Sequence, residues 1–488
     1  MRRLHLAALA GLLLGACAVG PDFKPPKPPG AADYGHASEA TATAAAQGPG
    51  GDAQHFVPGA DVSAQWWTLY RSPQLTALVE EALRANPNVA AAQASLREAR
   101  ELYYAQRSSL FPTLSAGASA ARAKNPQATI ANPTVSTNPT YNLFTAQLSV
   151  SYLPDVFGGG RRAVEAAHAQ ADSSRFQLEA TYLTLSSNVV VTVIAEAALR
   201  GQISATERLL ALQTQLAETA RRQRAIGAAS QLDVLAQESA QAQTAATLAP
   251  LRKQLALTRD ALTALLGRLP SEEPGERFEL SGLTLPTELP VSLPSRLVTQ
   301  RPDVRQAEAN LHAASAQVGV AVADMLPQFA ITGDLGSSAL TLSALFTPYT
   351  GFWDAGASLT QILFDAGALR HRKRAADAAL DAAAAQYRAA VILACQNVAD
   401  ALRSLQSDAE ALAGAQDAQH AAEATLALAR KQQALGALSF DAVLNVEQGY
   451  LQTEVAMVQA EANRYADTAA LFQALGGGWW NRPAGSAP

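Results

Sequence analysis

Four short stretches of the chain alternate apolar and polar residues at every second position. In the run from Gln147 to Tyr152, Leu, Val and Tyr occupy the even positions, and Gln and Ser occupy the odd ones. Because this period is that of a β-strand, the pattern predicts four strands. They are expected at 113–123, 141–153, 328–336 and 352–364.

Two features of these strands suit a lipid environment. Their length, roughly 10 residues, is that of a tilted membrane-spanning strand. Aromatic residues mark the strand ends, as in the girdle at a lipid–water boundary. These are Tyr141, Tyr152, Tyr349, Phe352 and Trp353. A water-soluble, half-buried sheet is the alternative that the strands alone leave open.

A second pattern predicts very long helices. From Arg161 to Ile226 there is no proline and a single glycine, Gly201. This predicts one helix over about 160–226, roughly 65 residues and about 100 Å long at 1.5 Å per residue. A matching helix is expected at 368–435, and shorter return helices at 230–267 and 439–475. In the last of these, apolar residues recur at every seventh position, which is typical of a coiled-coil seam.

The chain repeats itself once. Pro87 and Pro302 are 215 positions apart, and so are Pro112 and Pro327. The first repeat is therefore placed at 73–285 and the second at 286–476, each with a helix, two strands, a long helix and a return helix. Residues 477–488 remain as a C-terminal tail. A chance match in alanine-rich sequence is the alternative, but the paired prolines argue against it.

The first residues indicate export across the inner membrane. Residues 1–16 combine a basic start with a short apolar run, which predicts a signal peptide. The run ends in Leu-Gly-Ala before Cys17, the arrangement of a lipoprotein signal. We expect an N-palmitoyl and S-diacylglycerol lipid on Cys17; an ordinary signal with a chance cysteine is the alternative. Residues 17–72 lack a periodic apolar face and are expected to form an extended tether.

Composition narrows the function. The net charge of −5 is modest and gives no reason to expect nucleic acid as a partner. Of the two cysteines, Cys17 is assigned to lipid and Cys395 is left without a disulfide partner. The histidines are scattered, and we find no metal-binding spacing, phosphate loop or nucleophile motif. An enzyme is therefore not expected, and neither is a metal or cofactor other than the covalent lipid.

Four strands cannot close a membrane barrel, for which about eight is the minimum. An open sheet in lipid would leave backbone groups without hydrogen-bond partners. Several copies of the chain must then close one ring around a wet lumen. The long helices would carry the conduit across the periplasm. A spacer that bridges the envelope without a pore would not need the alternating strands.

Taken together, these features resemble the outer membrane efflux protein family, the TolC-like channels, and most closely its NodT/OprM-type lipoprotein branch. The residues that carry the resemblance are the run Cys17 to Phe23, Trp66-Trp67 before a helix at Pro73, the paired strand and long-helix units, and the two Gly-x-x-Ser tips. The resemblance implies a mostly α fold with membrane β-structure, in which a trimer forms a β-barrel of about 12 strands and a long α-barrel of about 12 helices.

The resemblance also implies partners. They are a homotrimer of the chain, outer membrane lipid, a periplasmic adaptor (membrane fusion) protein and an inner-membrane pump of the resistance-nodulation-division (RND) type. The function implied is a passive duct of a tripartite pump that exports drugs or other small toxic compounds. A type I channel for secreted proteins is the alternative.

Some residues receive roles from the resemblance alone. The tips between long and return helices are expected to face the adaptor, at Gly227 and Ser230 in the first repeat and at Gly436 and Ser439 in the second. A plain turn explains these residues equally well, since Gly permits a left-handed turn and Ser caps a helix. Candidates for a periplasmic gate lie beside the tips: Asp233, Asp441 and Asn445. Solvated helix-surface residues are the alternative for these three.

Overall fold

The computed structural model describes residues 18–31, 33–35, 41–124 and 140–482. The expected signal peptide, Cys17 and most of the longer strand connection, 125–139, lie outside these ranges. The chain divides into two compact units. The first contains residues up to 25, 96–173 and 307–386, and the second contains 26–95, 174–306 and the rest of the chain.

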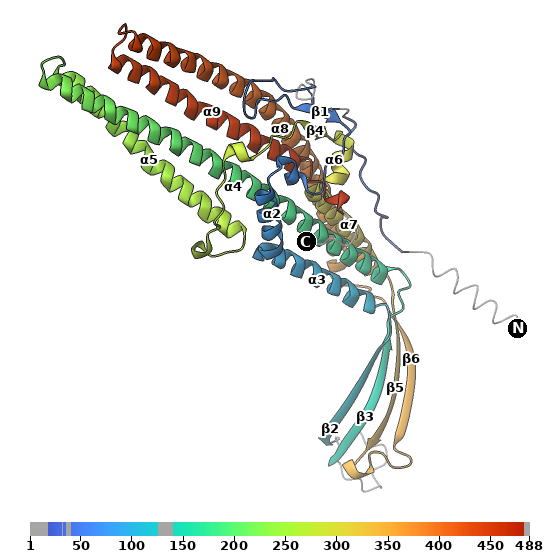
Figure 1. Cartoon of the computed structure of the whole chain (residues 1–488). Helices are drawn as coiled ribbons and strands as arrows, with labels where there is room; N and C mark the ends of the chain where they lie inside the picture. The colour runs from blue at the N-terminus through green and yellow to red at the C-terminus, as the bar shows by residue number, and fades with distance from the viewer. Residues whose placement is uncertain (1–17, 32, 36–40, 125–139, 483–488) are drawn as a thin grey trace, which may run out of the picture. The chain divides into compact units, whose positions relative to one another are not determined.

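A four-stranded antiparallel sheet dominates the first unit (Figure 1). Its strands are β2 (Thr113–Lys124), β3 (Thr140–Tyr152), β5 (Gln328–Ala339) and β6 (Gly351–Thr360), in the order β2-β3-β5-β6. All four lie where the alternation predicted strands. Each repeat thus contributes one hairpin, and β3 joins the two hairpins by pairing with β5.

The two faces of this sheet differ in chemistry. One face carries large apolar side chains that are open to the surroundings of a single chain. They are Leu114, Leu148, Val150, Leu335 and Trp353. Trp353 is 76% exposed and Leu114 is 70% exposed. A folded soluble protein rarely leaves so continuous an apolar surface uncovered, so this face requires a non-aqueous neighbour.

The sheet also has two free edges within the described residues. Strand β2 pairs only with β3, and strand β6 pairs only with β5. An unpaired edge presents backbone N–H and C=O groups that must be satisfied by another strand or by water. Both edges of the sheet therefore carry backbone groups that no strand in the described part of the chain pairs with.

The long helices match their expected bounds within about one residue. Helix α4 (Gly159–Ala225) and helix α8 (Ala368–Ala434) have 67 residues each. Their return partners are α5 (Gln231–Leu265) and α9 (Phe440–Ala474), with 35 residues each. Helix α5 continues through Pro250. The equal lengths in the two halves confirm the internal repeat.

Shorter elements complete each repeat. The helices are α2 (Pro73–Ala85), α3 (Pro87–Ser108), α6 (Pro294–Gln300) and α7 (Pro302–Ala323). Strands β1 (His55–Pro58) and β4 (Glu288–Val291) form a separate parallel pair. Single 3₁₀ turns lie at Trp66–Tyr70, Pro270–Glu272, Leu280–Gly282, Leu342–Ala344 and Trp479–Asn481.

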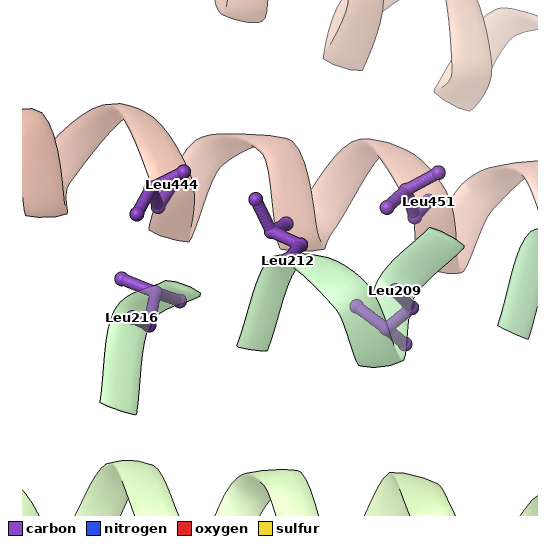
Figure 2. Packing of buried hydrophobic residues seen from close by; sticks show 5 residues of the cluster. All are labelled: Leu209, Leu212, Leu216, Leu444 and Leu451. Atoms are coloured by element: carbon purple, nitrogen blue, oxygen red, sulfur yellow. The ribbon is translucent and has the colours of Figure 1, made fainter. Parts of the chain in front are cut away.

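In the second unit, α4 packs against α9 through leucines (Figure 2). Leu209, Leu212 and Leu216 of α4 face Leu444 and Leu451 of α9, and all five are buried. Their spacing follows the coiled-coil period read from the sequence. At about 1.5–3 kcal/mol for each buried leucine, this seam is a main source of cohesion between the two repeats.

The segment before α2 is more ordered than a tether. Trp66 is fully buried and stacks on Phe472 of α9 with ring centroids 5.4 Å apart. Tyr70 donates a hydrogen bond of 2.8 Å to the Tyr465 carbonyl. Side chains of the stretch 41–72 therefore pack into the core of the second unit, and the structure differs there from the expected extended segment over 17–72.

Within the described part of the chain, two helices contain a window that is apolar enough to cross a membrane by length and composition. They are α4 and α8. The window in α4 is 61% buried by its own chain, whereas the window in α8 is only 11% buried. Ile392 and Leu393 of α8 are exposed. Helix α8 therefore presents an alanine-rich apolar face that a single copy leaves largely uncovered.

Candidate functional site

The polar face of the sheet holds a row of four residues, one from each strand. Ser115 of β2 is paired with Ser149 of β3, Ser149 with Asp334 of β5, and Asp334 with Asp354 of β6. Residues that are directly paired across strands point to the same face. The row therefore crosses the whole sheet on the face opposite to Leu148 and Trp353.

Hydrogen bonds orient one of the two carboxylates. The Ser149 hydroxyl and the Gln147 amide both donate to Oδ1 of Asp334, the latter at 3.3 Å. The Gln147 amide also donates to the Ser149 hydroxyl at 3.1 Å. Asp354 remains exposed at the β6 edge. Hydroxyl, amide and carboxylate groups make this face one that water can wet.

The two tips have the geometry of ordinary helix connections. Gly227 and Gly436 adopt left-handed φ angles of 78° and 73°. Ser230 accepts a hydrogen bond from the Asp233 amide and Ser439 accepts one from the Ala442 amide, each at 3.2 Å. Glycine and serine therefore have the turn and cap roles that their types predict. A Cβ at either glycine would meet no atom within 4 Å, so both tips have open space around them.

The structure gives each expected gate residue different surroundings. Asp233 completes a capping box, because its carboxylate accepts from the Ser230 backbone at 2.8 Å. Hydrogen bonds from the Ser230 backbone and hydroxyl hold the pKa of Asp233 below its usual value. Asp441 accepts a 2.6 Å hydrogen bond from Gln223 of α4. Asn445 is exposed one turn further along α9.

These contacts separate the three candidates. Capping alone accounts for Asp233, so nothing in its surroundings requires a gate. Asp441 instead connects the two repeats near their tips, which is a position from which a side chain could hold the helices together. A gating role for Asp233, Asp441 or Asn445 stays a prediction.

The residues that follow Cys17 are clamped in the first unit, which sequence reasoning missed. Arg162 of α4 is buried and donates to Asp22 at 2.6 Å and to the Val19 carbonyl at 3.2 Å. Phe23 stacks on His312 of α7 with centroids 4.2 Å apart. The Gly20 φ angle is 92°, and a Cβ there would lie 2.4 Å from the Gly319 Cα. The segment 18–23 is therefore fixed against α4 and α7.

Glu165 links the two sides of this clamp. It accepts 2.8 Å bonds from Arg162 and from His312. Although burial opposes it, hydrogen bonds from Arg162 and His312 lower the pKa of Glu165. The paired prolines give no hint of this network, and the only sequence signal is an Asp and a Phe at positions 22 and 23, shortly after Cys17.

A second buried cation holds the segment 41–54 in the second unit. Arg464 of α9 is fully buried and donates to the Gly50 and Asp52 carbonyls at 2.7 and 2.8 Å and to the hydroxyl of Thr43. Two carboxyls lie near it, Glu461 on α9 and Asp408 on α8. Burial raises the pKa of Glu461 to about 7, and burial with the neighbouring Asp467 raises the pKa of Asp408 to about 7.

In the described ranges, no group of three or more His, Cys, Asp or Glu side chains is arranged to hold a metal ion. A cavity of about 640 Å³ in the second unit is lined by Trp66, Trp67, Tyr182 and the Glu179–Arg482 pair, among others. Arg482 lies over the Tyr182 ring and 3.2 Å from Glu179. Small polar and apolar residues such as Ser63, Leu83 and Asn481 complete the lining.

The model of the outer membrane efflux protein family matches residues 78–268 and 293–477, one match for each repeat. The chain belongs to the outer membrane efflux protein family. It is an outer-membrane component of an efflux system, and the family and fold are those of channel proteins rather than enzymes.

Relatives of this efflux protein support the assignment over nearly the whole chain. The pyoverdine export outer membrane protein OpmQ of Pseudomonas putida is 29% identical over 85% of this chain and 88% of its own length. The probable efflux pump outer membrane protein TtgC of the same species is 28% identical over 97% of this chain and 95% of its own. The probable outer membrane lipoprotein SilC of Salmonella typhimurium is 28% identical over 85% and 88%.

Solved structures give the fold. The outer-membrane channel OprN has a TM-score of 0.82 at 28% identity, covering 95% of this chain and 100% of its own. The open-state MtrE channel of Neisseria gonorrhoeae has a TM-score of 0.76 at 26% identity, covering 95% and 99%. The expected TolC-like fold is therefore confirmed. The outer membrane is accordingly the location of this efflux protein.

Proposed function

We propose that three copies of this efflux protein form a passive duct that accepts small toxic compounds from a periplasmic adaptor and an RND-type inner-membrane pump. The duct itself performs no chemistry, so the energy for transport comes from the pump. The compounds leave through the lumen that the polar sheet faces enclose.

One observation carries this proposal: the four-stranded sheet combines an exposed apolar face with two free edges. In lipid, every unpaired backbone group at an edge costs several kcal/mol, so an open sheet does not persist there. Neighbouring copies satisfy the edges when β2 of one copy pairs with β6 of the next. Three copies supply about 12 strands, an even number within the range of known membrane barrels.

Helix α8 supports the same assembly. Its exposed alanine-rich face, with Ile392 and Leu393, lacks a partner within the described part of one copy. Alanine allows helices to approach closely, and a ring of copies would cover this face with a helix of the neighbour. The helical section would then be a wall of paired long and return helices.

A lipid on Cys17 would hold each copy at the membrane. The clamp formed by Arg162, Asp22 and Phe23 begins one residue after Cys17 and fixes the chain against α4 and α7. Acyl chains attached there would enter the membrane close to the end of β3, because the Val19 amide bonds the Phe157 carbonyl at 3.0 Å. This arrangement supports an anchor of fixed position.

The tips are the proposed contact with the adaptor. Gly227 and Gly436 have no neighbour within 4 Å of an added Cβ, which leaves room for another protein to approach. Short backbone turns with small residues suit close docking. A ring of three copies offers six such tips, two from each chain, as a repeated surface for a multimeric adaptor.

Deleting the gene and measuring growth against antibiotics, solvents, dyes, metal ions and siderophores would test the transport role. Restoring the wild-type gene should restore tolerance to the compounds affected. The purified, lipidated protein should migrate as a trimer in detergent and conduct ions across a planar bilayer. A monomer without conductance would contradict the duct, and loss of a secreted protein without any change in tolerance would favour type I secretion.

A further inference from the structure

The charged residues of the four strands are divided between the two faces of the sheet. The strands contain four charged side chains: Arg122, Lys124, Asp334 and Asp354. Asp334 and Asp354 lie on the polar face, in the row that also contains Ser149. Arg122 and Lys124 lie on the face of Leu114, at an even number of positions from it along β2.

No basic residue of the strands lies on the same face as the two aspartates, because Arg122 and Lys124 are on the opposite face. Neither connection between paired strands, 125–139 or 340–350, contains a charged residue. Asp334 is directly paired with Asp354, so the two carboxylates are neighbours on adjacent strands. The hydrogen bonds to Asp334 come from the neutral groups of Ser149 and Gln147. The negative charge of this band is therefore left for mobile ions to balance.

We infer that Asp334 and Asp354 are specificity-determining residues that make the membrane section of the duct prefer cations to anions. The inference rests on the proposed function, because the carboxylates face a lumen only when copies close the sheet. Three copies would place six carboxylates in one band of a water-filled passage. Cationic small compounds would then pass more readily than anionic ones of similar size.

Electrostatics favours such an effect at this position. The barrel wall and the lipid around it have a low dielectric constant, which concentrates the field of the carboxylates in the water of the lumen. At about 0.1 M salt the Debye length is about 10 Å, so the field reaches across much of the passage. Charged rings of this kind are a common source of ion selectivity in pores. The periplasmic residue Asn445, which is neutral, contributes no such field.

The decisive measurement is the reversal potential of the reconstituted protein in a KCl gradient. The wild-type protein should show the sign of a cation-preferring pore. Asp334→Asn and Asp354→Asn should each move the potential toward zero, and the double variant should move it furthest. Asp354→Lys, at the exposed edge position, should move it toward the anion side. The shifts should shrink at about 1 M salt, where the Debye length is only about 3 Å.

Matched controls separate the outcomes. Lys124→Gln removes a charge from the opposite face of the same sheet and should leave the reversal potential unchanged. Asp441→Asn tests whether selectivity resides at the periplasmic end instead. Conducting channels whose selectivity is unaffected by the two sheet variants would overturn this inference but keep the duct. Absence of any conductance from the trimeric wild-type protein would overturn the proposed function itself.

Discussion

The guanidinium of Arg464 donates a 2.8 Å hydrogen bond to the hydroxyl of Thr43, a residue 421 positions earlier in the chain. The same guanidinium donates to the carbonyls of Gly50 and Asp52 and to the side chain of Gln54. One fully buried cation thus ties the return helix α9 to the segment 41–54. Two backbone carbonyls and two neutral side-chain oxygens, rather than a carboxylate, accept these bonds.

Replacing this arginine should loosen the segment 41–56. Arg464→Met keeps the apolar stem but leaves several buried acceptors without donors, at about 1–3 kcal/mol each. We expect faster limited proteolysis within 41–56 and a lower unfolding temperature. Arg430→Met is the control, because Arg430 is exposed on α8 and its pair with Glu447 is screened by water. Equal effects of the two substitutions would contradict the assigned role of Arg464.

The clamp behind Cys17 depends on a glycine. In Gly20→Ala the new Cβ would lie 2.4 Å from the Gly319 Cα, and the residue would have to keep a φ of 92°. The segment 18–23 should therefore leave α4 and α7, and a spin label at the exposed Lys24, directly behind the segment, should become mobile. Gly30→Ala is the matched control, since a Cβ at Gly30 meets nothing within 4 Å. An immobile label in Gly20→Ala would show that the clamp tolerates the methyl group.

Stability should depend on pH through Glu461. Burial raises the pKa of Glu461 to about 7, above its usual value of 4.5. Between these values the folded chain binds more protons than the unfolded chain, so the free energy of unfolding falls as the pH rises through this window and is level outside it. Glu461→Gln should weaken this decline in denaturant titrations and stabilise the protein above pH 7.

Neighbouring groups set how much of this decline remains. The pKa of Asp408 is also raised to about 7, so Asp408 should preserve part of the decline in the free energy of unfolding with rising pH. Asp52, Arg464 and Tyr465 are the other charged or titratable groups around Glu461. Glu410→Gln alters an exposed carboxyl on α8 and should leave the wild-type slope in place. If Glu461→Gln behaved in the same way as Glu410→Gln, burial of Glu461 would not control the pH response.

The second tip offers a test of docking. Gly436→Trp adds a large ring where the structure has open space, so trimers should form while the pump loses function. Gly436→Ala is the control for backbone strain, because it must hold the same left-handed φ of 73° at a cost of about 1–2 kcal/mol. Drug tolerance should be lost with Trp and largely kept with Ala. Full tolerance in the Trp variant would argue against adaptor contact at this tip.

Periodic patterns predicted the strands and long helices because residues at a fixed spacing along each element lie on one face and share its surroundings. The strand ends were less accurate. Strand β6 was expected to reach 364 but ends at Thr360, because its partner β5 begins at Gln328 and the pairing ends there. Apolar residues beyond it, such as Leu363 and Phe364, extend the pattern without a strand to pair with.

The fold of 41–72 could not be read from such patterns. This segment is held by single anchors, Trp66 against Phe472 and Arg464 against backbone carbonyls, and a carbonyl leaves no mark in the sequence. The acidic pair on the sheet was visible only in part. The sequence of β5 puts Asp334 on the face opposite to Phe329 and Ile331, but its pairing with Asp354 follows from the register of β5 and β6, which the sequence does not specify.

The free edges of β2 and β6 also bear on how the protein is made. A newly exported copy has an apolar face that is unfavourable in water and unpaired backbone edges that are unfavourable in lipid. A single copy is therefore unstable in either environment. We therefore expect each copy to assemble with others soon after export, and to be bound by periplasmic chaperones until it does. A variant with a damaged edge would enter mixed oligomers with wild-type copies. Such a variant is therefore expected to be dominant negative when both are expressed together.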